Sequence, residues 1–360
     1  MSKTGKTVVT IILTILIVVL VGVMIWGMTG FGFWGSPASG TQNNFWNFGW
    51  RGCQGMNNFV ISGGKLPADA EKGYEFEVPL ADITSVDLNF VHENVDVKIY
   101  NGNTVKVQQT SNQKLDDVDV MRFGIVNGAF AAQSGLINRN VPGIRPGSTI
   151  TLYLPESFGL DAVLDTTSGR ITVGGGNYRT LQMDSTSGEI NAVELTAKSI
   201  DTDTTSGRIE LQNINSDSVN ADTVSGEVHV TGNAGHEFEA DSTSGSVTFS
   251  GMAEIVDANT VSGEVTADVA RTLRSFKADT TSGRVRLTVG DAQALKEVSA
   301  NTISGEVTIT LPQNDGFTVD YDSISGDLNN EFEMRGERHG NGHIDIDVDT
   351  ASGSLHILKG

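Results

Sequence analysis

Aspartates recur at a regular spacing in this 360-residue chain, and carboxylates arranged in that way could bind a cation. Five of them follow one another at intervals of 19 residues: Asp165, Asp184, Asp203, Asp222 and Asp241. Stacked carboxylates would offer the oxygen ligands that Ca²⁺ prefers. Alternatively, each could accept hydrogen bonds from the amides of the turn that follows it, as in an Asx turn. We expect such turns and assign no metal site, with the five aspartates kept as a candidate cation ladder.

The aspartates belong to a repeated phrase, D-[ST]-x-S-G, that predicts a stack of similar coils. Ten copies occur, and their glycines are separated by 18 to 22 residues except for a last interval of 27. A fixed period near 19 with residues typical of strands indicates a solenoid. The repeat glycines are Gly169, Gly188, Gly207, Gly226, Gly245, Gly263, Gly283, Gly305, Gly326 and Gly353.

Apolar residues alternate with polar ones on both sides of each glycine. The second residue after the glycine is aliphatic in every copy, from Ile171 to Leu355. The inward positions before the glycine have the opposite parity, so the Ser-Gly step must be a corner between two strands. Glycine suits a corner because it permits positive φ and close stacking of coils. The sequence therefore predicts an all-β fold, a parallel β-solenoid of coils of about 19 residues.

The residue after the glycine alternates in charge over the first four copies. Arg170, Glu189, Arg208 and Glu227 occupy this position. In a stack, these side chains would be neighbours of opposite sign, and each exposed pair would contribute little stability. We interpret them as a device that fixes which coil lies on which, with no part in catalysis.

An apolar segment near the N-terminus predicts a membrane anchor. Residues 8–28 are 21 residues without a charge, which is long enough to span a bilayer at about 1.5 Å per residue. Lys3 and Lys6 precede this segment, so the positive-inside rule places the N-terminus in the cytoplasm and the acidic body outside the cell. We expect an uncleaved single-pass helix in the cell membrane in preference to a signal peptide.

The composition divides the chain into four regions. Residues 1–30 are the cytoplasmic tip and anchor, 31–58 an aromatic and glycine-rich linker, 59–160 an irregular N-terminal part of the solenoid, and 161–360 the regular repeats. All four tryptophans lie between positions 26 and 50, which is typical of an interfacial belt, although a partner surface in the membrane is an alternative. The one cysteine, Cys53, excludes a disulfide framework.

Two segments interrupt the repeats. Residues 111–147 are polar and rich in glycine, and we expect them to leave the stack. A second insertion surrounds residues 334–343, where His339 and His343 could bind a metal but fit a glycine-rich hairpin better. Loops of this kind carry function more often than a scaffold does.

The formal net charge of −20 argues against nucleic acid as a partner, because phosphates require Lys and Arg. No Asp or Glu precedes Asp69, so the acidic residues all lie in the predicted external part. Nothing in the sequence calls for a cofactor.

The anchor, the strand-rich segment after it and the ten D-[ST]-x-S-G-x-[IVL] phrases together resemble the bacterial putative-adhesin family of β-strand-repeat proteins, which has no assigned biochemical function. The resemblance covers about residues 59–357. It implies a β-solenoid on the cell surface, in some members encoded with envelope-stress signalling systems. It implies no catalytic residues.

Three functions follow from these patterns. The first is a non-catalytic, membrane-anchored surface scaffold for adhesion or envelope-stress sensing, with an envelope protein or a cell-wall ligand as partner. The second is a polysaccharide-acting β-helix enzyme, which we do not expect because Asp, Ser and Arg recur at equivalent positions instead of breaking the repeat at one place. The third is a self-assembling surface protein, because the last coil, 349–358, has no evident cap and an open edge invites pairing.

Overall fold

The computed structural model describes residues 66, 70–117, 119–134, 147–341 and 343–360. The chain divides into two units, Met1–Phe59 and Val60–Gly360. The expected anchor, the aromatic linker and Cys53 fall in the first unit, outside the described residues. Among the residues that are described, no helix has the length and apolar character needed to cross a membrane.

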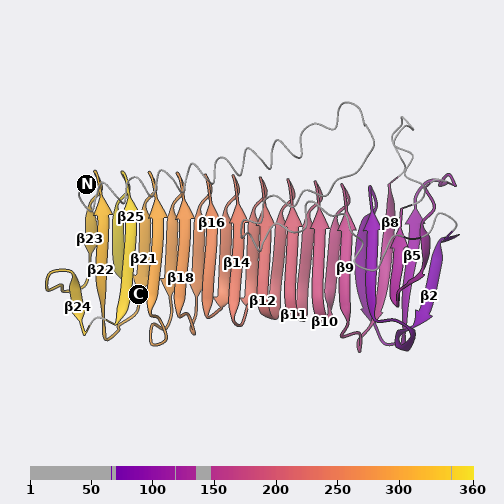
Figure 1. Ribbon diagram of the computed structural model, residues 1–360, viewed down its shortest axis with the longest axis horizontal. Helices are drawn as coiled ribbons and strands as arrows, with labels where there is room; N and C mark the ends of the chain where they lie inside the picture. The colour runs from indigo at the N-terminus through magenta and orange to yellow at the C-terminus, as the bar shows by residue number, and fades with distance from the viewer. Residues whose placement is uncertain (1–65, 67–69, 118, 135–146, 342) are drawn as a thin grey trace, which may run out of the picture. The chain divides into compact units, whose positions relative to one another are not determined.

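The second unit is all-β, and its repeats stack as two columns of parallel strands, as expected from the period of two (Figure 1). One column holds the strands that precede each corner, the other the strands that follow it. In spatial order the first column is β7 (Ala129–Gln133), β3 (Ser85–Phe90), β9 (Asp161–Thr166), the second halves of β10 (Ile171–Ser185), β11 (Ile190–Thr204) and β12 (Ile209–Thr223), then β14 (Glu237–Ser242), β16 (Ile255–Thr260), β18 (Ser275–Thr280), β20 (Glu297–Thr302), β25 (Ile344–Thr350) and β22 (Gly316–Ser323).

The second column runs beside the first in the same order. It consists of β8 (Ser148–Pro155), β4 (Asn94–Tyr100), the first halves of β10, β11 and β12, then β13 (Val228–Asn233), β15 (Val247–Met252), β17 (Val265–Val269), β19 (Val285–Val289), β21 (Val307–Leu311), β26 (Leu355–Lys359) and β23 (Leu328–Asn330).

Strands β10, β11 and β12 contribute to both columns because each bends between its two halves. The bend uses left-handed backbone at equivalent positions, with φ of +83° at Gly175, +55° at Glu194 and +53° at Asn213. Left-handed backbone is costly for residues with a Cβ, so the stack on either side must hold Glu194 and Asn213 in place.

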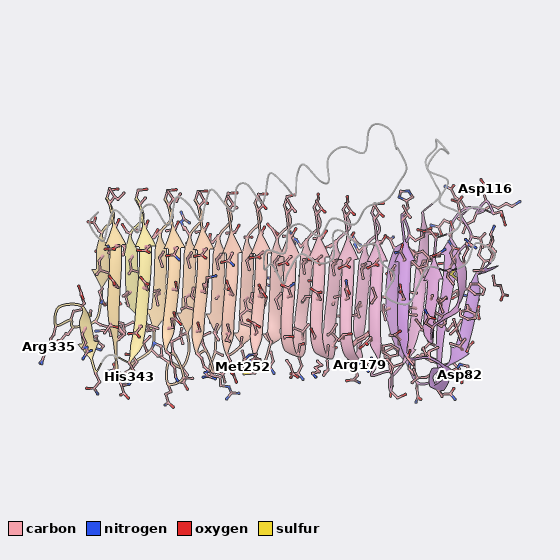
Figure 2. The ribbon with its side chains drawn as sticks, in the orientation of Figure 1. Asp82, Asp116, Arg179, Met252, Arg335 and His343 are labelled. Atoms are coloured by element: carbon pink, nitrogen blue, oxygen red, sulfur yellow. The ribbon has the colours of Figure 1, made fainter. Side chains whose placement is uncertain are left out.

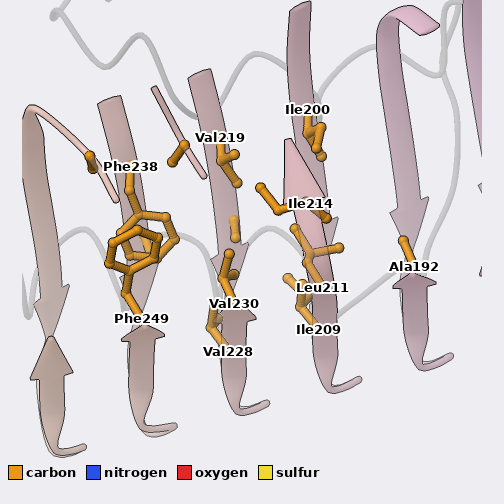
Figure 3. Close-up of a cluster of buried hydrophobic side chains, with 14 of the residues drawn as sticks. Ala192, Ile200, Ile209, Leu211, Ile214, Val219, Val228, Val230, Phe238 and Phe249 are labelled. Atoms are coloured by element: carbon orange, nitrogen blue, oxygen red, sulfur yellow. The ribbon is translucent and has the colours of Figure 1, made fainter. Parts of the chain in front are cut away.

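Equivalent residues of successive coils are in register, so their apolar side chains form continuous buried columns. Ile171 pairs with Ile190, and Ile190 with Ile209, and all three are fully buried as predicted. Figure 3 shows the same columns further along, where Phe238 and Phe249 stack with ring centroids 4.5 Å apart. Burying such a side chain contributes about 1.5–3 kcal/mol, and it requires a neighbouring coil on each side.

The N-terminal end closes the stack with antiparallel strands. β2 (Glu75–Pro79) pairs with β5 (Thr104–Ser111), and β5 pairs with β8. β1 (Glu71–Lys72) pairs with β6 (Arg122–Val126), which pairs with β7, and a 3₁₀ turn, η1 (Leu80–Asp82), follows β2. Phe76 of β2 stacks on Phe123 and Phe130, which covers the end of the core. Glu77 and Pro79 make β2 a poor edge for further pairing.

The expectation that residues 111–147 leave the stack is therefore wrong for part of that segment. Residues 122–133 form β6 and β7, and β7 pairs in parallel with β3. Residues 135–146 lie outside the described part of the chain. The sequence carries no clear signal for β7, because this strand is short and mostly alanine, and the residues around it are glycine and polar residues.

At the C-terminal end, the order of coils in space departs from their order in sequence (Figure 1). The last coil, β25–β26, lies between β20–β21 and β22–β23, and pairs in parallel with both. The outermost coil is β22–β23, and β24 (Arg338–Gly340) pairs with β22 in antiparallel fashion. The last coil in sequence is thus internal, and the expectation that it forms an open edge is wrong.

Candidate functional site

The corner glycines form a column in which backbone contacts backbone. A Cβ atom at Gly188, Gly207 or Gly226 would lie 1.6–1.9 Å from the carbonyl oxygen of the preceding glycine of the column. The column ends Gly305, Gly353, Gly326, which follows the order of the coils in space. None of the ten corner glycines has positive φ, so close approach, and not left-handed backbone, is why glycine occupies the corner.

A Ser or Thr hydroxyl closes each corner. In all ten copies the amide of the glycine donates to the hydroxyl oxygen three residues earlier, for example from Gly188 to Ser185 Oγ at 2.8 Å and from Gly207 to Thr204 Oγ1 at 3.0 Å. These hydroxyls are inside the stack, where an unpaired amide would be costly. Ser and Thr at this position are explained by this one bond.

The aspartate row lies on the outer side of the first column, one residue before these hydroxyls. Asp184 pairs in register with Asp165 and with Asp203, and Asp203 pairs with Asp222. We expected each carboxylate to bind the following turn amides, but the glycine amide is bound by the Ser or Thr hydroxyl instead. A carboxyl of the row can instead accept a hydrogen bond from the next coil: Asp222 Oδ1 accepts from the backbone amide of Asp241 at 3.0 Å.

Burial and mutual repulsion change the acidity of this row. Burial first, and then the adjacent Asp201, Asp184 and Asp222 carboxylates, raise the pKa of Asp203 to about 9. Burial and Asp241 raise the pKa of Asp222 to about 7. Burial also raises the pKa values of Asp165 and Asp184, whose carboxyls are close enough to share a hydrogen bond.

Asparagine interrupts the row in the second half of the stack. Asn259 Nδ2 donates to Asp241 Oδ1 at 3.0 Å, and Asn301 Nδ2 donates to Asp279 Oδ1 at 2.7 Å. An amide supplies the donor that a second carboxylate lacks, so these coils can stack without a shared proton.

A second row of polar side chains lies two residues before the aspartate row in each strand and was not predicted from the sequence. It includes Asp201, Asn220, Glu239, Asp257 and Lys277. Asn220 Nδ2 donates to Asp201 Oδ1 at 3.0 Å, and Lys277 forms an ion pair with Asp257 at 3.2 Å. The alternation of the strand could have predicted this row, because outward positions of a strand recur every second residue.

The charge ladder on the second column forms in part. Arg170 pairs with Glu189 at 3.1 Å and Arg208 with Glu227 at 2.7 Å, as the alternation predicted. Further along, Glu264 pairs with Arg286 and not with Arg284, the residue that follows the corner glycine Gly283. These pairs are largely exposed and hold adjacent coils in register.

His339 and His343 have separate partners. The His339 ring packs against Phe317 and Phe332, and its Nδ1 lies 2.8 Å from the carbonyl oxygen of Glu333. His343 lies 3.7 Å from Asp315. His343 and Arg335 mark the end of the stack in Figure 2. The described residues contain no group of three or more His, Cys, Asp or Glu side chains placed to hold a metal ion.

One hollow on the outer side of the second column is open and polar. Arg208, Glu227 and His229 line it, together with Ser246 and Thr248. The Arg208 and Glu227 side chains are already paired with each other across adjacent coils. The hollow therefore lacks the buried apolar wall and the convergent polar groups of a typical ligand pocket.

The stacked coils and their repeated corners agree with the comparison to known families. The family model described as "Toastrack DUF4097" matches residues 83–296 and 271–358, well over half of the chain. The chain belongs to the Toastrack DUF4097 family. A search of curated proteins finds no match to this Toastrack chain.

Several solved structures resemble this Toastrack protein at low identity. A putative cell adhesion protein from Clostridium sporogenes is 11% identical, with 81% of this chain and 100% of the other covered and a TM-score of 0.17. A putative lipid binding protein from Parabacteroides distasonis is 14% identical, with coverages of 78% and 95% and a TM-score of 0.42. A putative adhesin from the same organism is 11% identical, with coverages of 80% and 98% and a TM-score of 0.33. At these values the names say nothing about what this chain binds.

Proposed function

We propose that this Toastrack protein is a non-catalytic scaffold tethered to the cell membrane by residues 8–28, with its β-solenoid outside the cell. The observation that carries the proposal is the repetition of the stack. Equivalent outward positions lie in register from coil to coil, so that carboxyls and ion pairs form rows of polar side chains. A catalytic acid and base would need to differ from the residues at equivalent positions.

Such rows suit recognition of an extended or repetitive partner, such as a cell-wall polymer or an envelope protein. Leu66 packs beside Gly124 of β6, at the N-terminal end of the stack, so the solenoid begins at this end.

The single cysteine provides a direct test. In intact cells that express the full chain, a membrane-impermeant maleimide should label Cys53 without permeabilisation, and the protein should sediment with membranes. A variant lacking residues 8–28 should lose sedimentation with membranes. Labelling that appears only after permeabilisation would contradict the proposed orientation, and a full chain found in the soluble fraction would contradict the anchor.

Binding is tested separately, by crosslinking on intact cells followed by affinity purification. The full chain should capture a cell-wall polymer or an envelope protein, and substitution of outward residues in several adjacent coils should reduce capture more than substitution in one coil. Equal loss from a single substituted coil would indicate a discrete site and would contradict recognition by rows.

A further inference from the structure

The first four aspartates of the row follow one another in adjacent coils, with no asparagine or cation between them. Asp165, Asp184, Asp203 and Asp222 occupy adjacent coils, on strands that pair in parallel and in register. Neighbouring strands are about 4.8 Å apart, so the carboxyls are forced close together. From Asp241 to Asn301 the row alternates between aspartate and asparagine, and Asn259 and Asn301 donate to Asp241 and Asp279. At the C-terminal end Asp349 and Asp322 are again adjacent aspartates.

The groups that face these four carboxyls are acidic or neutral on every strand packed against them. They are Asp87 and Asn89 of β3, Gln182 of β10, Asp201 of β11, Asn220 of β12, and Glu239 and Asp241 of β14. Arg179 is paired with Asp161 at the far end of the same strands. Lys277 lies on β18 and pairs with Asp257 and Asp279. No cation among the described residues of these strands therefore neutralises the four carboxyls.

The hydrogen bonding of the first pair is incomplete unless a proton is shared. Asp165 Oδ1 and Asp184 Oδ1 are buried, and neither receives a hydrogen bond from an N–H or O–H group of any other described residue. Two carboxylates can only repel each other, whereas a carboxyl can donate to a carboxylate. Asp184 Oδ2 already accepts from Gln182 Nε2 at 2.8 Å, which leaves Asp165 as the donor.

We propose that Asp165, Asp184, Asp203 and Asp222 form a proton-dependent lock, which joins coils β9 to β12 while its carboxyls share protons and weakens the stack as they ionise. The raised pKa values given above for all four groups agree with this assignment. The lock is a property of the fold and does not depend on the proposed surface function.

The direction of the pH effect follows from the two states. At acidic pH the carboxyls are protonated in both the folded and the unfolded chain. As the pH rises above about 4, the unfolded chain loses these protons first, because its carboxyls have ordinary pKa values. Stability therefore falls with rising pH until the folded carboxyls also ionise, and for Asp203 this occurs only near pH 9.

The test is a series of thermal melts of the full-length protein in detergent between pH 5 and pH 9. We expect the melting temperature of the wild type to fall by roughly 5 °C or more over this range. Asp203→Asn should flatten the fall and melt above the wild type at pH 8–9, because an amide can donate where a carboxylate cannot. Asp268→Asn, at an exposed position of β17, and Asp279→Asn, in the interrupted part of the row, should keep the wild-type slope.

A pH-independent melting temperature, or an Asp203→Asn slope equal to that of the wild type, would overturn the proposal. Should Asp203→Asn fail to fold, infrared spectroscopy of the wild type decides. At pH 7 the carbonyl stretch of protonated carboxyls should be present and should disappear on thermal unfolding. Its absence at pH 7 would show that the row is ionised and that no lock exists.

Discussion

A Cβ atom built at Gly188 would lie 1.6 Å from the carbonyl oxygen of Gly169, although the two residues are 19 positions apart. No rotamer or small shift relieves such a contact, since both atoms belong to backbone that neighbouring coils hold in place. The distance between coils at the corner is thus set by hydrogen-bonded strands and tolerates only glycine.

Gly188→Ala should consequently destabilise the protein by about 1–3 kcal/mol or more, because one coil must move away from the next. Urea unfolding followed by circular dichroism measures the change. Gly147→Ala is the matched control, since no atom of the described residues beyond its chain neighbours lies within 4 Å of its Cβ position and its φ is not positive. The control should remain within about 0.5 kcal/mol of the wild type. Equal stability of the two variants would contradict the close corner.

Removal of a corner hydroxyl should also be costly. Thr204→Val keeps the shape of the side chain but leaves the Gly207 amide, now bound at 3.0 Å, without an acceptor inside the stack. We expect a loss of about 1–3 kcal/mol in the free energy of unfolding. Thr204→Ser keeps the hydroxyl, as Ser185 does one coil earlier, and should lose clearly less. A Ser variant as unstable as the Val variant would argue that packing of the methyl group, and not the bond, matters here.

The position of the last coil between two earlier ones leads to a prediction opposite to the one that stacking in sequence order would give. Leu355 of β26 is fully buried between β21 and β23, whereas Leu328 of the outermost β23 is 44% exposed. Leu355→Ala should cost about 2–5 kcal/mol and Leu328→Ala about 1 kcal/mol or less. Stacking in sequence order would make Leu328 the internal residue. A larger loss at Leu328 would therefore contradict the insertion.

The regular part of the fold could be predicted from the sequence because each coil repeats the same pattern of apolar, polar and glycine residues. Ile171 and its equivalents in the internal coils are buried, and the corner falls at the Ser-Gly step, since period and parity are visible in any one copy. The ends could not be predicted in this way. Nothing near Leu328 or Leu355 states which coil neighbours which, because each coil carries the same apolar pattern and would fit against either neighbour.

The candidate site was predicted as a row, but its chemistry was not. Spacing placed Asp165, Asp184 and Asp203 in line, as the pairing of strands shows. It did not show that Thr204 would take the turn amide, because Asp and Thr are both turn-capping residues and adjacent in sequence. Nor could it show the burial that makes the carboxyls weak acids, which depends on neighbouring strands.

Disulfide trapping tests the order of coils most directly. In a Cys53→Ser background, cysteines at Thr308 and His356, or at His356 and Asn329, would lie on adjacent paired strands about 4.8 Å apart and should form a disulfide readily. Cysteines at Thr308 and Asn329 would be separated by one strand, about 10 Å apart, and should remain reduced. A disulfide between positions 308 and 329, with none between 308 and 356, would contradict the stacked arrangement described here.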